Sequence, residues 1–391
     1  MGKARIHYFS ATGNTRRAVD IAAARLSEEG WELELIPILA RGAAKGGAAP
    51  RSAAASAATA SAATASAATA PAAAAPPNLT LVAFPTLAWG PPAFVRRHLL
   101  GLPGAEGERA AVLATCGGGA LGALGAAARL LERRGYEVLL TGAATYPSNW
   151  TQFEDGPSEE AAARETERGD AEARDFAEKL ASGARSRYGY PPLHALWSAP
   201  VALAFGFLGR RALGKLFVAD ASCTGCGLCA RVCPAAAISM EGAGRLARPR
   251  WSFSCENCNR CINACPSRSI QSSLFRALLH GAAFVLLAAA ALSWAGAAAG
   301  ALAALGAGAL ARTAAYLAAL AAGSAVALWL QFGLLDSLAY RLEGRAGSAL
   351  RASGYTKGFR RYLAKGFDPA AEAKLAARSG DAAGRSPKQG S

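Results

Sequence analysis

The sequence predicts three structural units in series: an α/β domain with a doubly wound parallel sheet, a small α+β domain organised by cysteines, and a C-terminal hairpin of two apolar helices. In the first part of the chain, apolar strand patterns alternate with helical patterns. Eight of the nine cysteines then form two copies of one spaced pattern. Behind them, residues 277–335 contain a single charged residue, Arg312, which is typical of membrane-spanning segments.

The α/β domain is expected over residues 1–155. Its strands and helices are predicted from apolar runs that alternate with amphipathic stretches. The expected strands begin with I-H-Y-F after Lys3 and continue at 32–36, 79–84, 110–115 and 137–142, with helices at 93–100 and 121–134 and one directly after the first strand. Ligands bind beyond the carboxyl ends of such strands, where three polar loops follow, at 10–15, 85–90 and 115–119.

The first of these loops has the composition of a phosphate-binding loop. Its hydroxyl side chains and the backbone amides that precede the helix can surround an anion, which the positive end of the helix also favours. The hydroxyls belong to Ser10, Thr12 and Thr15, and the amides to Gly13 and Asn14. A Ser/Thr/Gly run can also be an ordinary N-cap and turn. The surrounding strand and helix pattern is what favours the phosphate-binding interpretation.

A low-complexity insert, residues 42–77, interrupts the α/β domain between its second and third strands. It repeats the unit S-A-A-T-A where a crossover helix is normally expected. The repeat is too short for a solenoid and too weakly apolar to span a bilayer. A flexible loop or a loose Ala-rich helix is therefore expected there, without ligand chemistry.

The cysteine domain, residues 216–272, carries the spacing of a pair of four-iron clusters. Each copy reads Cys-x2-Cys-x2-Cys-x3-Cys-Pro, in which three cysteines bind one cluster and the fourth binds the other. One set is Cys223, Cys226, Cys229 and Cys265, and the second is Cys255, Cys258, Cys261 and Cys233. Two zinc sites or a disulfide framework are the alternatives, but zinc sites rarely repeat this pattern, and no secretory signal precedes the domain.

A helical linker, residues 156–215, is expected between the two domains. Residues 159–180 interleave opposite charges, which predicts a helix with solvated faces. Residues 191–208 are apolar but short and contain Pro200, so an interfacial or packing helix is expected rather than a crossing. On a membrane, Arg210, Arg211 and Lys215 would contact lipid headgroups.

Two transmembrane helices are expected at Phe275–Ala297 and Thr313–Leu335, within residues 275–335, with a buried soluble hairpin as the alternative. Basic residues flank the pair on its outer ends, which places both ends in the cytoplasm. They are Arg268 and Arg276 before it, and Arg341, Arg345, Arg351, Lys357, Arg360, Arg361 and Lys365 after it. His280 is expected to reach the interface. The basic tail, residues 336–391, is expected to be largely disordered beyond Asp368.

The cysteine motifs, with their Cys-Pro-x-x-x-Ile endings, resemble the bacterial two-cluster ferredoxin family over residues 216–272. The loop S-A-T-G-N-T resembles that of the flavodoxin family. Together they resemble the flavodoxin–ferredoxin fusions known as EFR1-family ferredoxins, over about residues 5–270; the hairpin is not part of this likeness. The resemblance implies two 4Fe-4S clusters and FMN.

By that likeness, the FMN phosphate would bind to Ser10, Thr12, Gly13, Asn14 and Thr15. Thr86 and Trp89 would border the flavin ring, although Trp89 could instead pack on Phe94. Backbone groups at the pyrimidine edge would come from Thr115, Cys116, Gly117 and Gly118, and weaker candidates for the pocket are Tyr146 and Asn149. The thiol of Cys116 is expected to be a small buried group without a redox role.

These features predict a membrane-anchored electron carrier that passes electrons between two 4Fe-4S clusters and FMN. Its expected partners are redox donor and acceptor proteins and membrane lipid, because the net charge of +15 lacks the aromatic-interleaved pattern of nucleic-acid binding. Two alternatives are an oxidoreductase for a small organic or quinone substrate, and a flavin-free redox or iron sensor. No catalytic residue is assigned, since no hydrolase, protease or G-x-G-x-x-G nucleotide motif is present.

Overall fold

The computed structural model describes residues 2–39, 78–189, 192–345 and 354–375. The S-A-A-T-A repeats lie outside the described residues. The chain divides into two compact units. The N-terminal unit comprises Met1–Pro147, Ala162–Ala199 and Ala370–Ser391, and the C-terminal unit comprises Ser148–Ala161 and Pro200–Pro369.

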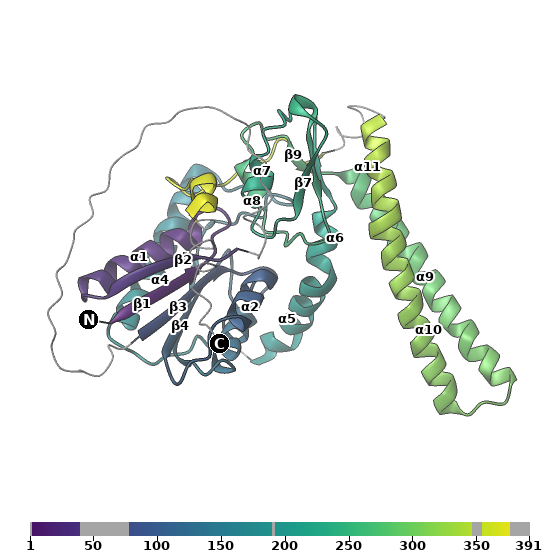
Figure 1. The fold of residues 1–391 in the computed structure, drawn as a ribbon, viewed down its shortest axis with the longest axis horizontal. Coiled ribbons are helices and arrows are strands. Elements are labelled where there is room, and N and C mark those ends of the chain that lie inside the picture. Colours follow the sequence, from purple (N-terminus) through teal and green to yellow (C-terminus); the bar gives the residue numbers. More distant parts are fainter. Residues whose placement is uncertain (1, 40–77, 190–191, 346–353, 376–391) are drawn as a thin grey trace, which may run out of the picture. The chain divides into compact units, whose positions relative to one another are not determined.

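The N-terminal unit contains a five-stranded parallel sheet in the order β2-β1-β3-β4-β5 (Figure 1). Its elements are β1 (Lys3–Tyr8), α1 (Asn14–Glu28), β2 (Glu32–Pro37), β3 (Asn78–Pro85), α2 (Ala93–Leu100), β4 (Arg109–Cys116), α3 (Gly122–Glu132), β5 (Glu137–Thr145) and α4 (Glu159–Ala181). This strand order is that of flavodoxin-like folds. The predicted doubly wound α/β class is confirmed.

The sheet is covered on both faces, which explains its continuous apolar strands. In β4 every residue after Arg109 is buried. Helices α1 and α4 share one core with alternate residues of β1 and β3, whereas α2 and α3 lie side by side on the other face (Figure 1). This arrangement leaves the carboxyl ends of β1, β3 and β4 free for the polar loops.

Helix α4 has the predicted solvated charged face, but its other face belongs to this core, so it is more than a linker helix. Its residues Ala173, Phe176, Ala177 and Leu180 are buried at helical spacing against the sheet. Phe176 lies directly on β5, because a Cβ atom placed on Gly142 would be 2.5 Å from the Phe176 ring. The α/β unit therefore extends past residue 155.

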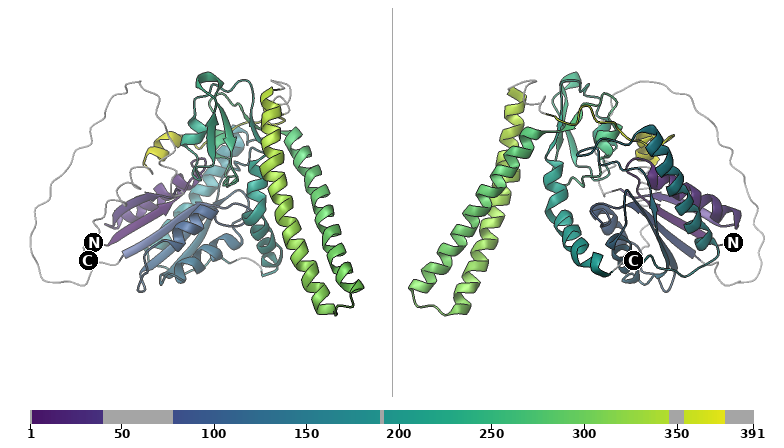
Figure 2. Two further views of the ribbon diagram at one scale, coloured as in Figure 1. Left: turned by 45° about the vertical axis from the view of Figure 1, so that its right-hand side comes forward. Right: turned by 180° about the vertical axis from the view of Figure 1, so that it is seen from behind.

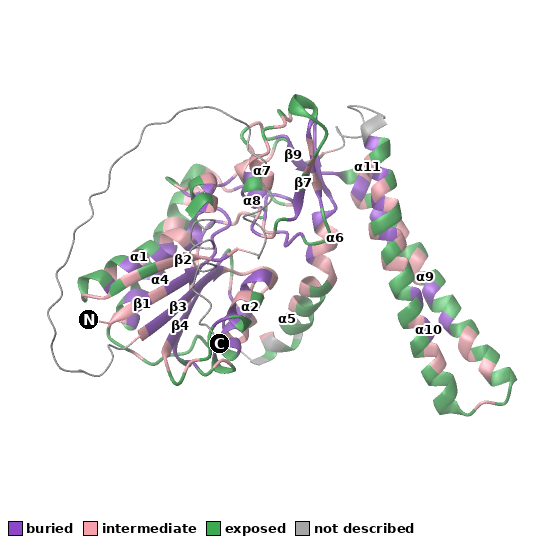
Figure 3. Cartoon of the chain, in the orientation of Figure 1, coloured by how far each residue is buried: buried purple, intermediate pink, exposed green. Residues whose placement is uncertain are grey.

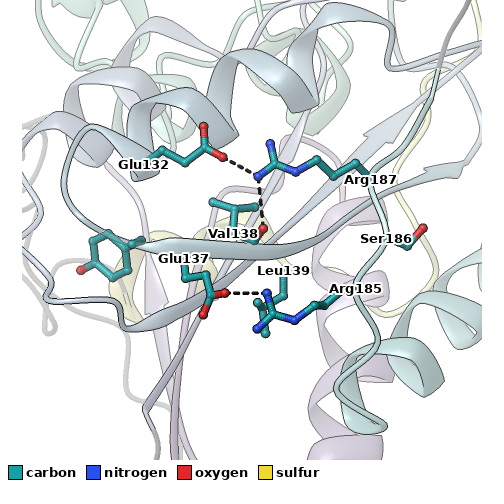
Figure 4. A pocket seen from close by; sticks show the side chains of 8 residues that line it. Glu132, Glu137, Val138, Leu139, Arg185, Ser186 and Arg187 are labelled. Carbon is teal, nitrogen blue, oxygen red and sulfur yellow. Dashed lines mark hydrogen bonds and ion pairs between the residues drawn. The ribbon is translucent and has the colours of Figure 1, made fainter.

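The edge of the sheet at β5 is covered by the segment that follows α4. Ser186 exchanges backbone hydrogen bonds with Leu139 and Thr141, both at 3.0 Å. Figure 4 shows the shallow pocket beside this segment, where Arg185 pairs with Glu137 and Arg187 with Glu132. The pocket lies at the amino end of β5, opposite the polar loops, so it is separate from the predicted cofactor site.

The C-terminal unit combines a small module, which we call the ferredoxin module (residues 216–272), with a long helical hairpin. Its elements are α5 (Pro192–Ala204, shared with the first unit), η2 (Phe205–Gly209), α6 (Arg210–Gly214), β6 (Phe217–Ala219), α7 (Leu228–Arg231), β7 (Ile238–Glu241), η3 (Gly244–Leu246), β8 (Arg248–Trp251), α8 (Arg260–Ala264), β9 (Ile270–Ser272), α9 (Leu274–Ala304), α10 (Ala309–Trp329), η4 (Leu330–Leu335) and α11 (Asp336–Arg345). Two antiparallel pairs, β6-β9 and β7-β8, form the module's sheets.

The hairpin consists of the antiparallel helices α9 and α10, which lie side by side in all three views (Figures 1 and 2). Both are long and apolar enough to cross a membrane, and only 11% and 6% of their most apolar windows are buried (Figure 3). Such exposure is unlike the core of a soluble hairpin. The helices pack closely where a Cβ on Gly323 would lie 3.2 Å from that of Ala291.

A buried set of charges, which we call the junction network, joins the base of the hairpin to the ferredoxin module. Arg276 donates two hydrogen bonds of 2.8 Å to Glu343 and one of 3.0 Å to Asp336. Lys215 pairs with the other oxygen of Asp336 at 2.8 Å. All four residues are at most 5% exposed. Lys215 therefore does not face lipid headgroups, contrary to expectation.

Two other basic or ionisable residues near the hairpin also differ from expectation. Arg210 is buried and pairs with Glu256 at 2.8 Å, so it does not point toward lipid. His280 is 6% exposed and stacks on Phe332 at a ring distance of 5.6 Å, rather than reaching the interface. The ion pair offsets the cost of burying Arg210, whereas neither ring nitrogen of His280 has a hydrogen-bond partner among the described residues.

The chain returns to the ferredoxin module after the hairpin, along residues 354–362, which we call the C-terminal strap. Gly354 forms a bridge with Ser273, and the hydroxyl of Thr356 accepts the amide of Ser272 at 3.1 Å. Beyond Asp368, where disorder was expected, residues 369–375 are helical and Glu372 is 9% exposed. Residues 376–391 lie outside the described residues.

Candidate redox sites

The two cysteine motifs have the same backbone conformation. In the first motif Gly225, Gly227 and Ala236 have positive φ angles of 71°, 69° and 49°. The corresponding positions of the second motif are Asn257, Asn259 and Arg268, with φ of 55°, 58° and 50°. Glycine and asparagine adopt this left-handed conformation most easily. The repeated turns direct the cysteines of each motif in the same way.

The second predicted cysteine set lines one small buried cavity. Its walls include Cys233, Cys255, Cys258 and Cys261, together with the fully buried Trp251. Cys233 comes from the first motif, as the crossed ligand pattern requires. Amides of Ala237 and Asn257 point at the sulfurs of Cys233 and Cys255, at 3.2 and 3.4 Å.

Without a metal, burial keeps the thiols of this cavity protonated. Burial, and then repulsion from Cys233, raises the pKa of the Cys255 and Cys258 thiols. Thiolates packed in an apolar site are therefore stable only when a metal compensates their charge. No cysteine of the chain is in a disulfide. Among the described residues, no three Cys, His, Asp or Glu side chains converge as the ligands of a single metal ion do.

The first predicted set is more accessible to solvent. Cys226 is exposed, and Cys223, Cys229 and Cys265 are half-buried. Burial and repulsion from Cys265 raise the pKa of the Cys229 thiol to about 12, so these two sulfurs are close. The hydroxyls of Ser269 and Ser267 lie 3.3 and 3.6 Å from the Cys265 sulfur. Burial by itself would raise the pKa of the Cys265 thiol, but hydrogen bonds from these hydroxyls outweigh burial, so that this pKa is lowered.

The three polar loops of the N-terminal unit meet at the carboxyl ends of their strands. The hydroxyls of Thr15 and Thr115 are 2.6 Å apart, and the amide of Thr86 donates to the Thr115 carbonyl at 2.9 Å. Gly13, with φ of 106°, precedes α1 and lets the chain turn into the helix. Ser10, Thr12 and Asn14 are buried in the same loop. The amide of Gly13 donates to the Ser10 hydroxyl at 3.1 Å, which fixes the loop at the N-terminus of α1.

The second loop contains a tight turn. Leu87 and Gly90 exchange two backbone hydrogen bonds, and Ala88 and Trp89 between them both have positive φ, at 45° and 60°. Such conformations are costly for residues other than glycine and often mark ligand sites. Phe94, the proposed alternative neighbour of Trp89, packs edge-on against Phe9 at 4.8 Å.

The third loop and its neighbours divide into exposed and buried groups. Gly117 and Gly118 are exposed, as groups that bind a flavin edge must be. Cys116 is buried and burial raises the pKa of its thiol, in keeping with an inert side chain. Tyr146 is 1% exposed and donates to Asp170 of α4 at 3.1 Å. Asn149 belongs to the other unit, where its carbonyl accepts from Asn263.

Several residues that contact the cysteine loops were not predicted from the sequence. Gly214 packs so tightly on Cys255 that a Cβ would lie 2.5 Å from the Cβ of that cysteine. Arg260 is 1% exposed and donates to the carbonyl of Val232 at 3.1 Å. Aligning the two motifs with each other would have found Asn257 and Asn259, since they stand where the first motif has glycine.

Comparison with known families supports the reading of the cysteine motifs. The family model of the 4Fe-4S dicluster domain matches residues 222–269. No match was found among curated proteins. The chain thus contains a 4Fe-4S dicluster domain joined to a flavodoxin-like fold.

Solved structures similar to the chain are flavodoxins. One from Streptococcus pneumoniae TIGR4 shares 17% identity and covers 46% of this chain and 98% of its own, with a TM-score of 0.28. A flavodoxin from the domain Archaea shares 13% identity. The match covers 46% of this chain and 98% of that flavodoxin, with a TM-score of 0.26. A short-chain flavodoxin associated with a non-canonical PDU bacterial microcompartment shares 11% sequence identity. The match covers 46% of this chain and 99% of that flavodoxin, with a TM-score of 0.27. With scores this low, the fold assignment depends on the strand order.

Proposed function

We propose that this protein is a membrane-anchored electron carrier that holds two 4Fe-4S clusters and FMN. The observation that carries the proposal is the repeated left-handed backbone of two four-cysteine motifs, with one complete set of four thiols around a single cavity. Iron-sulfur clusters exchange one electron at a time, whereas a flavin can exchange one or two. A chain that holds both could therefore transfer electrons between one-electron and two-electron carriers. An electron-transfer role accounts for both folds.

The ligand assignment follows the crossed pattern. Cys223, Cys226, Cys229 and Cys265 would hold one cluster, and Cys255, Cys258, Cys261 and Cys233 the other. Buried thiols with raised pKa, as at Cys255, fit a positively charged iron-sulfur core. Amide and hydroxyl groups near the sulfurs would then adjust the potentials of the clusters.

FMN would bind at the three loops of the N-terminal unit. The residues from Ser10 to Thr15, at the start of α1, suit the phosphate, and the strained turn at Trp89 suits the flavin ring. Thr86, Thr115, Gly117 and Gly118 would complete the site. The hydrogen bonds between the loops support this assignment, because they hold all three in one place.

The hairpin would anchor the protein in the cytoplasmic membrane, with the redox units and the C-terminal tail on the cytoplasmic side. The support is the exposed apolar surface of α9 and α10. The bridge between Ser273 and Gly354 adds to it, because it joins the chain before the hairpin to the chain after it. Two crossings return the chain to the same side of a bilayer.

The test is an anaerobic purification from detergent-solubilised membranes, followed by assays of iron, acid-labile sulfide and FMN. We expect about eight irons, about eight sulfides and one FMN per chain. Replacing Cys258 with serine should remove about half of the iron and leave FMN unchanged, and Cys116→Ser is the matched control that should change neither. Zinc in place of iron would refute the electron carrier, and iron without FMN would favour the flavin-free sensor.

A further inference from the structure

The two cysteine sets differ in how far solvent and other proteins can reach them. Cys226, in the first set, is exposed, whereas Cys255 and Cys261, in the second, are 7% and 9% exposed. Electron exchange between proteins requires a close approach to the cofactor. Of the eight described cysteines in the ferredoxin module, Cys226 is the one that is exposed, so the loop around it offers that approach.

Arginines surround this loop. The guanidinium of Arg231 donates to the carbonyl of Cys226 at 2.8 Å. On the other side, the backbone of Arg245 is in van der Waals contact with Gly225, where a Cβ would lie 3.4 Å from the Arg245 Cα. Arg268 follows Cys265, a member of the same set. All three arginines are exposed.

These positive charges are not neutralised within the described part of the chain. None of the three arginines forms an ion pair with a described residue. The two acidic groups nearest in sequence are already engaged: Glu241 pairs with Arg250 at 3.0 Å, and Asp220 with Lys357 at 3.0 Å. Three positive side chains that are not in ion pairs with described residues therefore face solvent near this loop.

An apolar side chain stands among these charges. Leu246 follows Arg245 in the short helix η3 and is 79% exposed, the highest value for a large apolar residue in the ferredoxin module. Apolar centres with charged rims are the usual composition of transient protein interfaces. We call this surface, formed by Cys226, Arg231, Arg245, Leu246 and Arg268, the arginine face.

We propose that the arginine face is the docking site for an acidic one-electron carrier protein. This inference depends on the proposed electron-transfer function. In the docked pair one electron passes between the partner's redox centre and the cluster of the first set, so that one is oxidised as the other is reduced, and no proton or bond is exchanged. Opposite charges would steer the encounter and fix its orientation.

The experiment measures the rate at which a reduced, acidic plant-type [2Fe-2S] ferredoxin reduces the full-length protein in stopped flow. The rate should be high at low salt and fall as salt screens the charges, over a Debye length of about 10 Å at 0.1 M. The double variant Arg245→Glu/Arg268→Glu should react about tenfold or more slowly at low salt. It leaves the hydrogen bond of Arg231 to the cysteine loop in place.

The matched control is Arg164→Glu/Arg174→Glu, which makes the same charge change at two exposed arginines of α4. It should react as the unaltered protein does. Equal rates for the two double variants, or a rate of the unaltered protein that salt does not change, would overturn the proposal. The iron assay, done first on every variant, separates the two inferences: absence of clusters refutes the proposed function, and intact clusters with an unchanged rate refute the arginine face alone.

Discussion

Gly214→Ala should selectively prevent the second cysteine set, which contains Cys255, from binding its cluster. The added Cβ would lie 2.5 Å from the Cβ of Cys255 and 2.8 Å from its sulfur, so one group must move by roughly 1 Å to restore normal contact. Overpacking of this kind costs about 1–3 kcal/mol, which lowers the population of the correct geometry about 5- to 150-fold. We expect iron to fall from about eight to about four per chain.

The assay is iron and sulfide content with electron paramagnetic resonance of the reduced protein, which distinguishes one cluster from two interacting clusters. Gly206→Ala is the matched control, because a Cβ there meets no atom within 4 Å. Full iron content in Gly214→Ala, with an unchanged spectrum, would refute the view that this glycine is needed for Cys255 to bind its cluster.

Three other changes give independent predictions. Burial lowers the pKa of the His7 imidazole to about 3 in the folded state, whereas in the unfolded state it is about 6.5. Below pH 6.5 the unfolded state therefore binds one proton more than the folded state, and the free energy of unfolding decreases as the pH falls. Between pH 7 and 5 this amounts to about 2 kcal/mol, which His7→Asn should abolish in chemical denaturation. Glu343→Gln leaves the buried cations Arg276 and Lys215 to share the single carboxylate of Asp336 and should cost about 3–5 kcal/mol, seen as a lower unfolding temperature in detergent, whereas a loss below about 1 kcal/mol would contradict the buried pairing. Ser269→Ala removes the hydroxyl beside the Cys265 sulfur and should lower one cluster's potential by at most about 60 mV in a redox titration, with the other potential as internal reference.

Local patterns predicted the fold class of each part of the chain. The parallel α/β sheet, the dicluster module and the apolar hairpin followed from alternation, cysteine spacing and apolar length, all of which are contained in short windows of sequence, whereas the strand order did not. The burial of α4 was missed because charged residues surround the stripe from Ala173 to Leu180. That stripe has helical spacing, so a stricter count of apolar positions would have found it.

Long-range pairing accounts for the other differences. Lys215 was predicted to be a headgroup contact and Arg276 a basic residue flanking the first span, because their acidic partners lie 60 or more residues further along the chain. No local pattern links such positions. The close approach of Gly214 to Cys255 is likewise a contact between separate elements, which only the folded chain brings together.

The C-terminal strap has a consequence for how the protein is made. Asn263, between two ligands of the second motif, accepts the amide of Tyr362, which lies 99 residues later. At about 5–20 residues per second, a ribosome needs roughly 5–20 s to synthesise that interval, most of which is hairpin. During this time the cysteine loops lack their final hydrogen bonds. Complete loading with iron is therefore expected to follow hairpin synthesis rather than to precede it.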